Sequence, residues 1–357
     1  MKALGQKPKG KNLAAVEKSK FYVNGTFKNI NVTPQLKEGV SMFAVGTKLL
    51  LKKKPDDIKP PKPVPSLKTD LTSIQSGTPT IVWFGHSSYL IKHLGKTVLV
   101  DPVFSGHASP VSMFVKAFDG ANTYGVNEMP FIDMLVITHD HYDHLDYETV
   151  LALKAQNKIG HVYTALGVGS HLESWGFSSD MISEFEWWQG EKVSDRSDGS
   201  SASGSLRGIE ITATPARHFS GRDLQRDKTL WASFVLRMGE YKFFIGGDSG
   251  YDDQFKVIGE KFGPFDIVFL ECGQYGENWP YIHMFPEQTA QAAKDLGAKI
   301  LFPVHWGKFI LSDHAWNASI ERVGVAAGQL GVRLTTPKIG EQIVLDKVIP
   351  NGKWWLD

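Results

Sequence analysis

The segment THDHYDH, residues 138–144, constrains the fold and chemistry of this chain more than any other part of it. Four metal-binding side chains, His139, His141, Asp143 and His144, lie within six residues, directly after a short apolar run. Imidazole and carboxylate groups at this spacing suit borderline divalent metals such as zinc. His139 and His141 can face one ion while Asp143 and His144 face a second, so the motif predicts a two-metal site. Because the 357 residues include only 12 histidines, chance clustering is a poor explanation.

The sequence on either side of the motif predicts its place in the fold. Residues 131–138 have the pattern of a short buried strand, and residues 145–156 have that of a helix, with Asp143 or Asp146 as its N-cap. The motif would then form a strand-to-helix turn at the carboxyl end of a strand. That is where α/β proteins place their sites.

Composition and hydropathy argue against a membrane-spanning protein and a disulfide-stapled one. No segment reaches the ~20 consecutive apolar residues that a membrane-spanning helix needs, and the single cysteine, Cys272, cannot form an internal disulfide. Residues 1–10 lack the apolar core of a signal peptide. We expect the chain in the cytoplasm or bound peripherally to a membrane; removal of a signal peptide from a longer precursor is the open alternative.

The N-terminal part of the chain is strongly basic. Residues 1–70 contain 15 lysines and five acidic residues, a charge of +10, which leaves −9 for the remainder of a chain whose net charge is +1. A proline-rich connector covers residues 55–66. We predict a basic N-terminal segment with this connector over residues 1–66, and a main domain over residues 67–357. The segment could bind an anionic membrane surface or nucleic acid, or be a solvated extension. Its apolar run 40–51 could lie on a membrane or pack as a helix on the main domain.

The main domain is predicted to be α/β with two sheets. The expected strands cover residues 80–84, 88–91, 96–100, 131–138, 208–213, 230–237, 241–245, 266–270 and 299–303, and the expected helices cover residues 145–156, 252–262, 286–296 and 317–330. Several strands follow one another without a helix between them, so the sheets are antiparallel or mixed. Two such groups, each followed by helices, indicate two stacked sheets with helices outside. The polar stretch 194–205 is expected to be a hairpin loop.

Three further candidate ligands follow expected strands. His218, Asp248 and His305 each lie shortly after a strand, and Asp248 is preceded by two glycines that allow the backbone to approach an ion closely. Taken singly, they could be a surface histidine, a helix N-cap and a core histidine. Taken together with the motif, they are better explained as one constellation.

These residues and their order resemble the metallo-β-lactamase superfamily of hydrolases. The resemblance covers residues 80 to about 345 and implies a four-layered αβ/βα sandwich with two metals at one edge of its sheets. It implies that one metal is bound by His139, His141 and His218, that the second is bound by Asp143, His144 and His305, and that Asp248 bridges both. True β-lactamases usually use a cysteine or a different second-metal set, and Cys272 is at none of these positions.

Shorter motifs are similar to the branch of N-acyl-phosphatidylethanolamine-hydrolysing phospholipases D. They cover residues 83–86 (WFGH), 101–104 (DPVF), 138–146, 215–222, 229–233, 247–251 (GDSGY), 283–288 (HMFPEQ) and 305–307 (HWG). The resemblance implies a phosphodiesterase that cleaves such phospholipids with a hydroxide activated by two Zn²⁺ ions, with Mn²⁺ or Fe²⁺ as other candidates. A lactonase of the ascorbate-phosphate type, or another ester hydrolase that uses the same site, is the competing interpretation. A metal-bound membrane-docking module without catalysis is a third.

The expected catalytic residues are Asp248, His283 and Tyr142. His283 is the candidate general acid, with a structural histidine as the alternative, and Tyr142 could line the pocket or bind a product oxygen. Asp101 is expected to orient a ligand histidine. The aromatic stretch 279–281 could form an apolar groove for acyl chains. The expected partners are a phospholipid or other phosphodiester and a membrane surface, with no nucleic acid.

Overall fold

The computed structural model describes residues 1–41, 55–75, 77–194 and 205–357, and two mixed β-sheets form its centre. The first sheet has the order β15-β3-β4-β5-β6-β7-β8, and the second has the order β14-β13-β12-β11-β10-β9. The strands of the first sheet are β3 (Thr80–Trp83), β4 (Tyr89–His93), β5 (Lys96–Val100), β6 (Ile132–Ile137), β7 (Ile159–Ala165), β8 (Ile182–Phe185) and β15 (Gln342–Val344). Those of the second are β9 (Gly190–Ser194), β10 (Ser205–Thr214), β11 (Ser233–Met238), β12 (Tyr241–Ile245), β13 (Ile267–Glu271) and β14 (Leu301–Val304).

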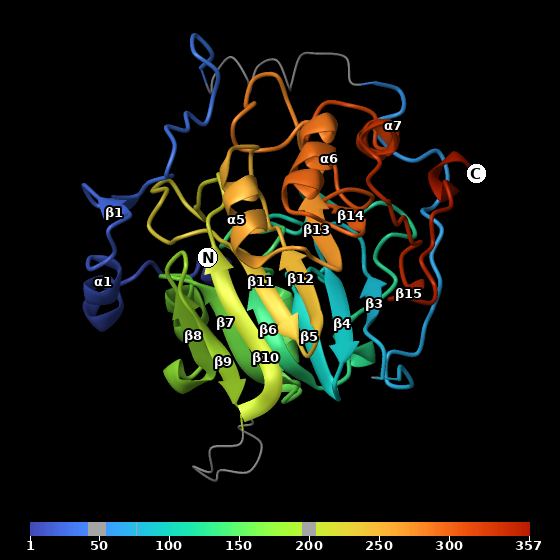
Figure 1. The fold of residues 1–357 in the computed structure, drawn as a ribbon. Helices are drawn as coiled ribbons and strands as arrows, with labels where there is room; N and C mark the ends of the chain where they lie inside the picture. The colour runs from blue at the N-terminus through green and yellow to red at the C-terminus, as the bar shows by residue number, and fades with distance from the viewer. Residues whose placement is uncertain (42–54, 76, 195–204) are drawn as a thin grey trace.

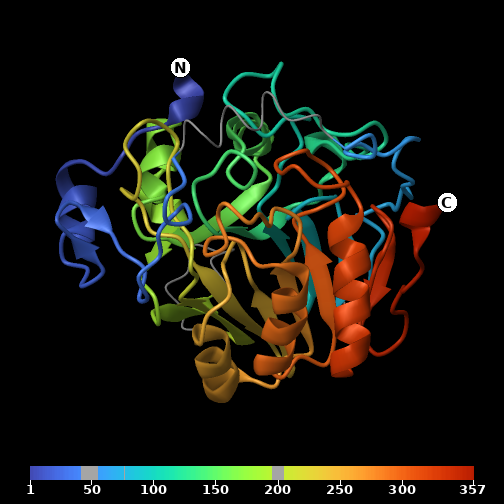
Figure 2. The same cartoon turned by 90° about the horizontal axis from the view of Figure 1, so that it is seen from above.

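Helices cover the outer faces of the two sheets. Figure 1 shows the sheets stacked face to face, and Figure 2 shows α5, α6 and α7 on one side of the stack with α3 and α4 on the opposite side. The helices are α1 (Gly10–Val16), α3 (Tyr147–Ala155), α4 (Gly169–Ser174), α5 (Gln254–Phe262), α6 (Pro286–Asp295) and α7 (Ala318–Leu330). The predicted four-layered αβ/βα sandwich is therefore confirmed.

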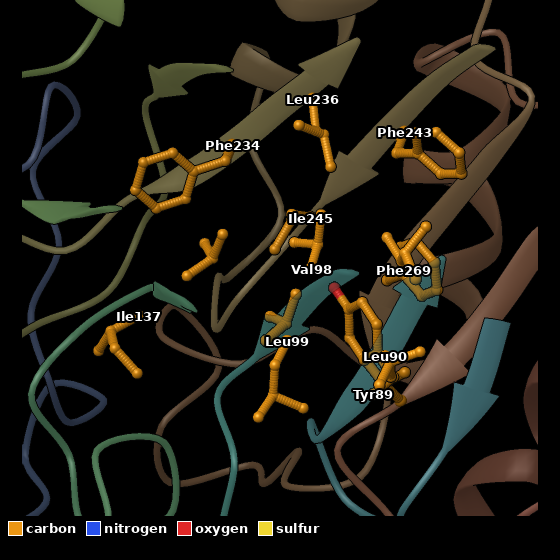
Figure 3. Packing of buried hydrophobic residues seen from close by; sticks show 14 of the residues in the cluster. Tyr89, Leu90, Val98, Leu99, Ile137, Phe234, Leu236, Phe243, Ile245 and Phe269 are labelled. Carbon is orange, nitrogen blue, oxygen red and sulfur yellow. The ribbon is translucent and has the colours of Figure 1, made fainter. Parts of the chain in front are cut away.

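The core lies between the two sheets. Tyr89 of β4 stacks on Phe269 of β13 with ring centroids 4.0 Å apart, and neighbouring aliphatic and aromatic side chains from both sheets interdigitate around them (Figure 3). The strands β3 and β13 are buried at every residue, because a second sheet covers one face and helices or loops cover the other. Full burial of each large apolar side chain stabilises the fold by about 1.5–3 kcal/mol.

The pattern of strand pairing brings several strand ends to one edge. In the first sheet β5, β6, β7 and β8 run parallel, and in the second β12, β13 and β14 run parallel. Parallel strands end at the same edge of a sheet, so the loops that follow them lie together. This edge carries the motif that follows β6.

Each predicted strand and helix is present, with ends shifted by up to three residues. The helix after the motif begins at Tyr147 because the Asp146 carboxylate accepts a hydrogen bond from the Glu148 amide at 3.1 Å, as an N-cap does. The sequence did not predict β7, β8, β9, β15, α1 and α4. In β7, Gly160 and His161 interrupt the apolar run. The predicted apolar helix over residues 40–51 and the loop over residues 194–205 lie almost wholly outside the described residues.

The N-terminal 41 residues lie against the main domain. They include α1 and the short hairpin of β1 (Tyr22–Val23) and β2 (Thr26–Phe27), drawn in blue at the side of the sheets in Figure 1. Val16 and Phe27 are buried in the same apolar cluster as the sheets. The boundary at residue 66 stays a prediction. Within the described ranges, no helix is long and apolar enough to cross a membrane.

Candidate metal centre

Loops that follow four strands deliver the seven predicted ligands to one place. The four motif residues follow β6, and the other three, His218, Asp248 and His305, follow β10, β12 and β14. Gly247 makes the approach of Asp248 feasible, because it has a φ of 58° and a Cβ there would lie 2.9 Å from Thr138 Cβ. We call the seven residues the His–Asp cluster.

Four groups of the cluster converge on a first point. His141 Nδ1 lies 3.0 Å from His139 Nε2 and 3.2 Å from His218 Nε2. Asp248 Oδ2 lies 3.8 Å from His139 Nε2 and 3.6 Å from His218 Nε2. Three nitrogens and one carboxylate oxygen within 4.8 Å of one another form a donor set that a divalent metal favours.

A second point lies on the other side of Asp248. His305 Nε2 is 3.3 Å from Asp143 Oδ2 and 3.1 Å from Asp248 Oδ1, and His144 Nε2 is 3.2 Å from the same Asp248 oxygen. His86 joins this group, because its Nε2 lies 3.0 Å from Asp143 Oδ2. Asp248 thus directs one carboxylate oxygen to each point.

Several atoms of the cluster have no hydrogen-bond partner among the described residues. They are His144 Nε2, Asp248 Oδ1 and both ring nitrogens of His305, all buried. Burying such groups without a partner costs about 1–3 kcal/mol each. Their chemistry and their convergence fit bound cations.

The electrostatics of the cluster also favour a cation. Burial lowers the pKa of His139 and His218 well below the ordinary value, so both imidazoles are neutral, the form that binds metals. Burial also opposes protonation of His305, but the carboxylates of Asp248 and Asp143 outweigh it and raise its pKa to about 9. The two carboxylates therefore attract positive charge, which divalent metals would supply.

Hydrogen bonds behind the cluster fix the orientation of its imidazoles. His144 Nδ1 donates to Asp101 Oδ2 at 2.8 Å, and His218 Nδ1 donates to the Ile282 carbonyl at 2.8 Å. Asp101 also accepts from the hydroxyl and amide of Thr138, at 2.7 and 2.9 Å. Each histidine then presents its other nitrogen to the cluster, as metal ligands do. Asp101 therefore lies behind a ligand histidine, as we expected from the sequence.

The predicted general acid, His283, lies at the edge of the cluster. Its Nδ1 is 3.0 Å from both carboxylate oxygens of Glu271, which is fully buried at the end of β13. Glu271 also accepts a hydrogen bond from the Ser249 amide at 3.0 Å. With Nδ1 bound to this carboxylate, His283 has Nε2 left for a substrate. The ring centroid lies 5.5 Å from that of His305 and 5.0 Å from that of His218.

Tyr142 points into the protein. Its hydroxyl donates to the Arg222 carbonyl, and the Arg222 guanidinium lies 4.1 Å from its ring centroid. Arg222 in turn donates to the carbonyls of Asp140 and Leu145, at 2.7 and 2.8 Å. These contacts hold the motif turn in place. A catalytic role for Tyr142 stays a prediction.

A cavity of about 310 Å³ opens above the cluster. His141, Asp143, Asp248, His283 and His305 form its floor. Its walls are mostly apolar or aromatic, with two amides and one arginine, and consist of Gln35, Leu36, Phe219, Arg226, Gln274, Trp279, Ile282 and Leu311. Trp279 lines the cavity, as expected for the stretch 279–281.

Two contributions to the site were missed by the sequence analysis. Glu271 ends an apolar strand at the same edge as the ligands, and a carboxylate at the carboxyl end of a buried strand was the available signal. Gln35 and Leu36 come from the N-terminal segment, far from the motif in sequence. No local pattern marks them as part of a site.

Three site residues, His86, Asp101 and His305, have backbone conformations that L-residues rarely adopt. His86 has a φ of 55° and His305 a φ of 68°. Each loop holds the other, because the His305 amide donates to the His86 carbonyl at 3.0 Å and the His86 amide donates to the Trp306 carbonyl at 3.0 Å. Strain of this kind, about 1–3 kcal/mol per residue, persists where the surroundings fix it and is concentrated at functional sites.

Comparisons with known proteins agree with this geometry. The model of the β-lactamase superfamily domain matches residues 96–306. An uncharacterized protein of Mycobacterium tuberculosis is 34% identical over 351 residues, which cover 96% of this chain and 89% of that protein. The mitochondrial N-acyl-phosphatidylethanolamine-hydrolyzing phospholipase D of Saccharomyces cerevisiae is 30% identical over 272 residues, 74% of this chain and 55% of the yeast protein.

A solved structure supports the fold. A metallo hydrolase from the archaeon Ignicoccus hospitalis superimposes with a TM-score of 0.56 at 18% identity, over 76% of this chain and all of that one. The solved structure shows the fold alone, whereas the family model and the sequence relatives also identify the family. This chain is a metal-dependent hydrolase and belongs to the metallo-β-lactamase superfamily.

Proposed function

We propose that the protein is a phosphodiesterase of the phospholipase D type that acts on N-acyl-phosphatidylethanolamine-like phospholipids with two metals, zinc being preferred. The observation that carries this proposal is the mostly apolar cavity directly above a His–Asp cluster whose Asp248 directs one oxygen to each of two donor sets. The relative from yeast that hydrolyses such a lipid supports the substrate class. A small polar lactone would not use the apolar walls.

In the proposed site, His139, His141 and His218 would hold one metal, Asp143, His144 and His305 would hold the second, and Asp248 would bridge them. Metals bound there would polarise a phosphoryl oxygen and lower the pKa of water, which favours hydrolysis at neutral pH. The walls from Leu36, Trp279, Ile282 and Leu311 would hold apolar chains and exclude bulk water from the reacting phosphate.

The residues of the chain supply the proton for the leaving group. Water adds its oxygen to phosphorus, the bond from phosphorus to the N-acylethanolamine oxygen breaks, and that oxygen takes a proton from His283 Nε2. Glu271 holds the other ring nitrogen and so fixes the orientation of the ring for the transfer. The proton lost by water passes to solvent, and the products are phosphatidic acid and N-acylethanolamine.

The test is hydrolysis of N-acyl-phosphatidylethanolamine in mixed micelles, with phosphatidic acid measured by mass spectrometry. We expect metal-dependent release by the native enzyme and a loss of at least about 1000-fold in Asp248→Asn, because the amide has one oxygen and no negative charge, so the two proposed metal positions no longer share a carboxylate. Asp133→Asn is the matched control, since Asp133 lies at the opposite end of β6 and binds Lys96 and the Thr97 amide.

Two results would contradict the proposal. Full turnover by Asp248→Asn would exclude the two-metal arrangement. Hydrolysis of sugar-phosphate lactones without any release of phosphatidic acid would identify the competing lactonase.

A further inference from the structure

We propose that Arg226, held by Gln35 of the N-terminal segment, is a substrate-binding residue that recognises an anionic group. This inference deepens the proposed function and rests on it, because it selects anionic phosphodiesters over neutral esters at the same site. It concerns the mouth of the cavity and none of the proposed metal ligands.

Arg226 has a charge that no other wall residue shares. Among the described residues that line the cavity, it is the one with a fixed positive charge. It is exposed, in the loop between His218 and β11. Its guanidinium lies 5.2 Å from the ring centroid of Phe219, and that ring lies 4.5 Å from the ring of His141. One aromatic side chain therefore separates the guanidinium from the His–Asp cluster.

The partners of Arg226 leave its charge available. Its Nη1 donates to the amide oxygen of Gln35, and in the described part of the chain no carboxylate lies within ion-pair distance of it. Two half-buried arginines behave differently: Arg237 pairs with Glu210 at 2.7 Å and Arg322 pairs with Glu287 at 2.7 Å. The adjacent Asp227 accepts from the Ser220 amide and interacts with Arg226 only electrostatically, beyond ion-pair distance. A neutral amide positions the guanidinium without neutralising it.

The N-terminal segment fixes the position of Gln35. We call residues 29–37 the N-terminal strap. Asn29 exchanges two hydrogen bonds with the backbone of His218, at 2.8 and 3.1 Å, and Thr33 accepts from Arg217 Nε at 2.9 Å. Beyond Gln35, the Lys37 amide donates to the Asn278 carbonyl at 2.8 Å. The strap is thus anchored on both sides of the residue that holds Arg226.

An arginine in this setting suits a phosphate or carboxylate. The guanidinium has five N–H donors in a planar fork, and one is used by Gln35, so the others can bind two anion oxygens. A lysine would supply the charge without the fork. The geometry assigns to Arg226 the recognition of negative charge, while the apolar walls receive the remainder of the substrate.

The experiment compares two small substrates with the same leaving group, bis(4-nitrophenyl) phosphate and 4-nitrophenyl acetate. In Arg226→Gln we expect KM for the anionic phosphodiester to rise about 10-fold or more, with kcat changed less than about threefold and KM for the neutral ester unchanged. Gln35→Glu, which is isosteric and would pair with Arg226, should have the same effect. Arg226→Lys should recover part of the affinity, and Arg237→Gln is the control that should match the native enzyme.

A binding measurement separates this inference from the proposed function. Calorimetry with inorganic phosphate on the metal-loaded protein needs no turnover, and Arg226→Gln and Gln35→Glu should weaken binding by a similar factor at unchanged metal content. If the native enzyme fails to cleave phosphodiesters but these variants still weaken phosphate binding, the proposed function is wrong and the role of Arg226 in anion binding is supported. Unchanged phosphate affinity in both variants, or an equal loss in Arg237→Gln, would overturn the assignment.

Discussion

At the scale of single residues, the site depends on pairs in which a carboxylate or a backbone carbonyl orients a histidine ring. Asp101 holds His144, the Ile282 carbonyl holds His218, and Glu271 holds His283. A histidine whose one nitrogen is bound in this way presents the other in a fixed direction. In the proposed mechanism Glu271 would therefore be a positioning residue, because it would act on a substrate through His283.

Glu271→Gln is expected to weaken proton donation and leave binding intact. The amide is isosteric but has one acceptor oxygen where the carboxylate has two, so it holds His283 Nδ1 less firmly, and kcat should fall about 10- to 100-fold with little change in KM. The defect should be large for N-acyl-phosphatidylethanolamine, whose alkoxide leaving group needs a proton, and small for bis(4-nitrophenyl) phosphate, whose nitrophenolate does not. His283→Gln should show the same contrast. Equal losses on both substrates would indicate a structural role only, and Glu210→Gln serves as the surface control.

At the scale of elements, the buried side chain of Lys308 connects loops at one edge of the sheets by hydrogen bonds. Its side chain is fully buried, and Nζ donates to the Phe84 carbonyl at 3.0 Å and to the Val103 carbonyl at 2.8 Å. It therefore connects the loops that follow β3, β5 and β14. Burial lowers the pKa of Lys308 to about 7, with Asp146 opposing the shift.

This burial predicts how stability changes with pH. Between about pH 7 and the ordinary lysine value, the unfolded chain binds a proton at Lys308 that the folded chain has released. Stability must therefore rise with pH in this window, by at most about 1.4 kcal/mol per pH unit for one proton. Urea unfolding at pH 7, 8 and 9 should show this rise relative to Lys308→Met, which lacks the proton. Lys256→Met, on the exposed face of α5, should keep the native slope, and parallel curves for native protein and Lys308→Met would refute the shift.

The sequence predicted most of the strands and helices and the seven cluster residues because their signals are local. The motif lies within six residues after β6, and His218, Asp248 and His305 each follow a strand with a recognisable apolar pattern. The contacts of Glu271 and of the N-terminal strap were not predictable in this way. Asn29 meets His218 at a separation of 189 residues, and such contacts depend on how the strap packs, which no spacing rule encodes.

At the scale of the whole molecule, the His–Asp cluster joins the two halves of the sandwich. His139, His141, Asp143 and His144 belong to the loop after β6 of the first sheet, whereas His218, Asp248 and His305 follow strands of the second. Each proposed metal would be bound by residues from both sheets. Metal binding should therefore resist separation of the sheets as well as enable catalysis.

Metal removal is expected to lower the stability of the whole chain and not only its activity. A ligand present at about 1000 times its Kd stabilises the folded state by about 4 kcal/mol, which for a chain of this size corresponds to a Tm difference of roughly 5–10 °C. Calorimetric scans should show this decrease after treatment with a chelator, with recovery on adding Zn²⁺ or Mn²⁺.

Ca²⁺ should fail to restore the stability, because calcium favours six to eight oxygen ligands and the cluster is rich in nitrogen. In Asp248→Asn the difference should shrink, since Asp248 contacts both donor sets, whereas Asp133→Asn should keep it. Identical melting of chelated and metal-loaded protein would show that the two sheets are held together by their apolar core alone.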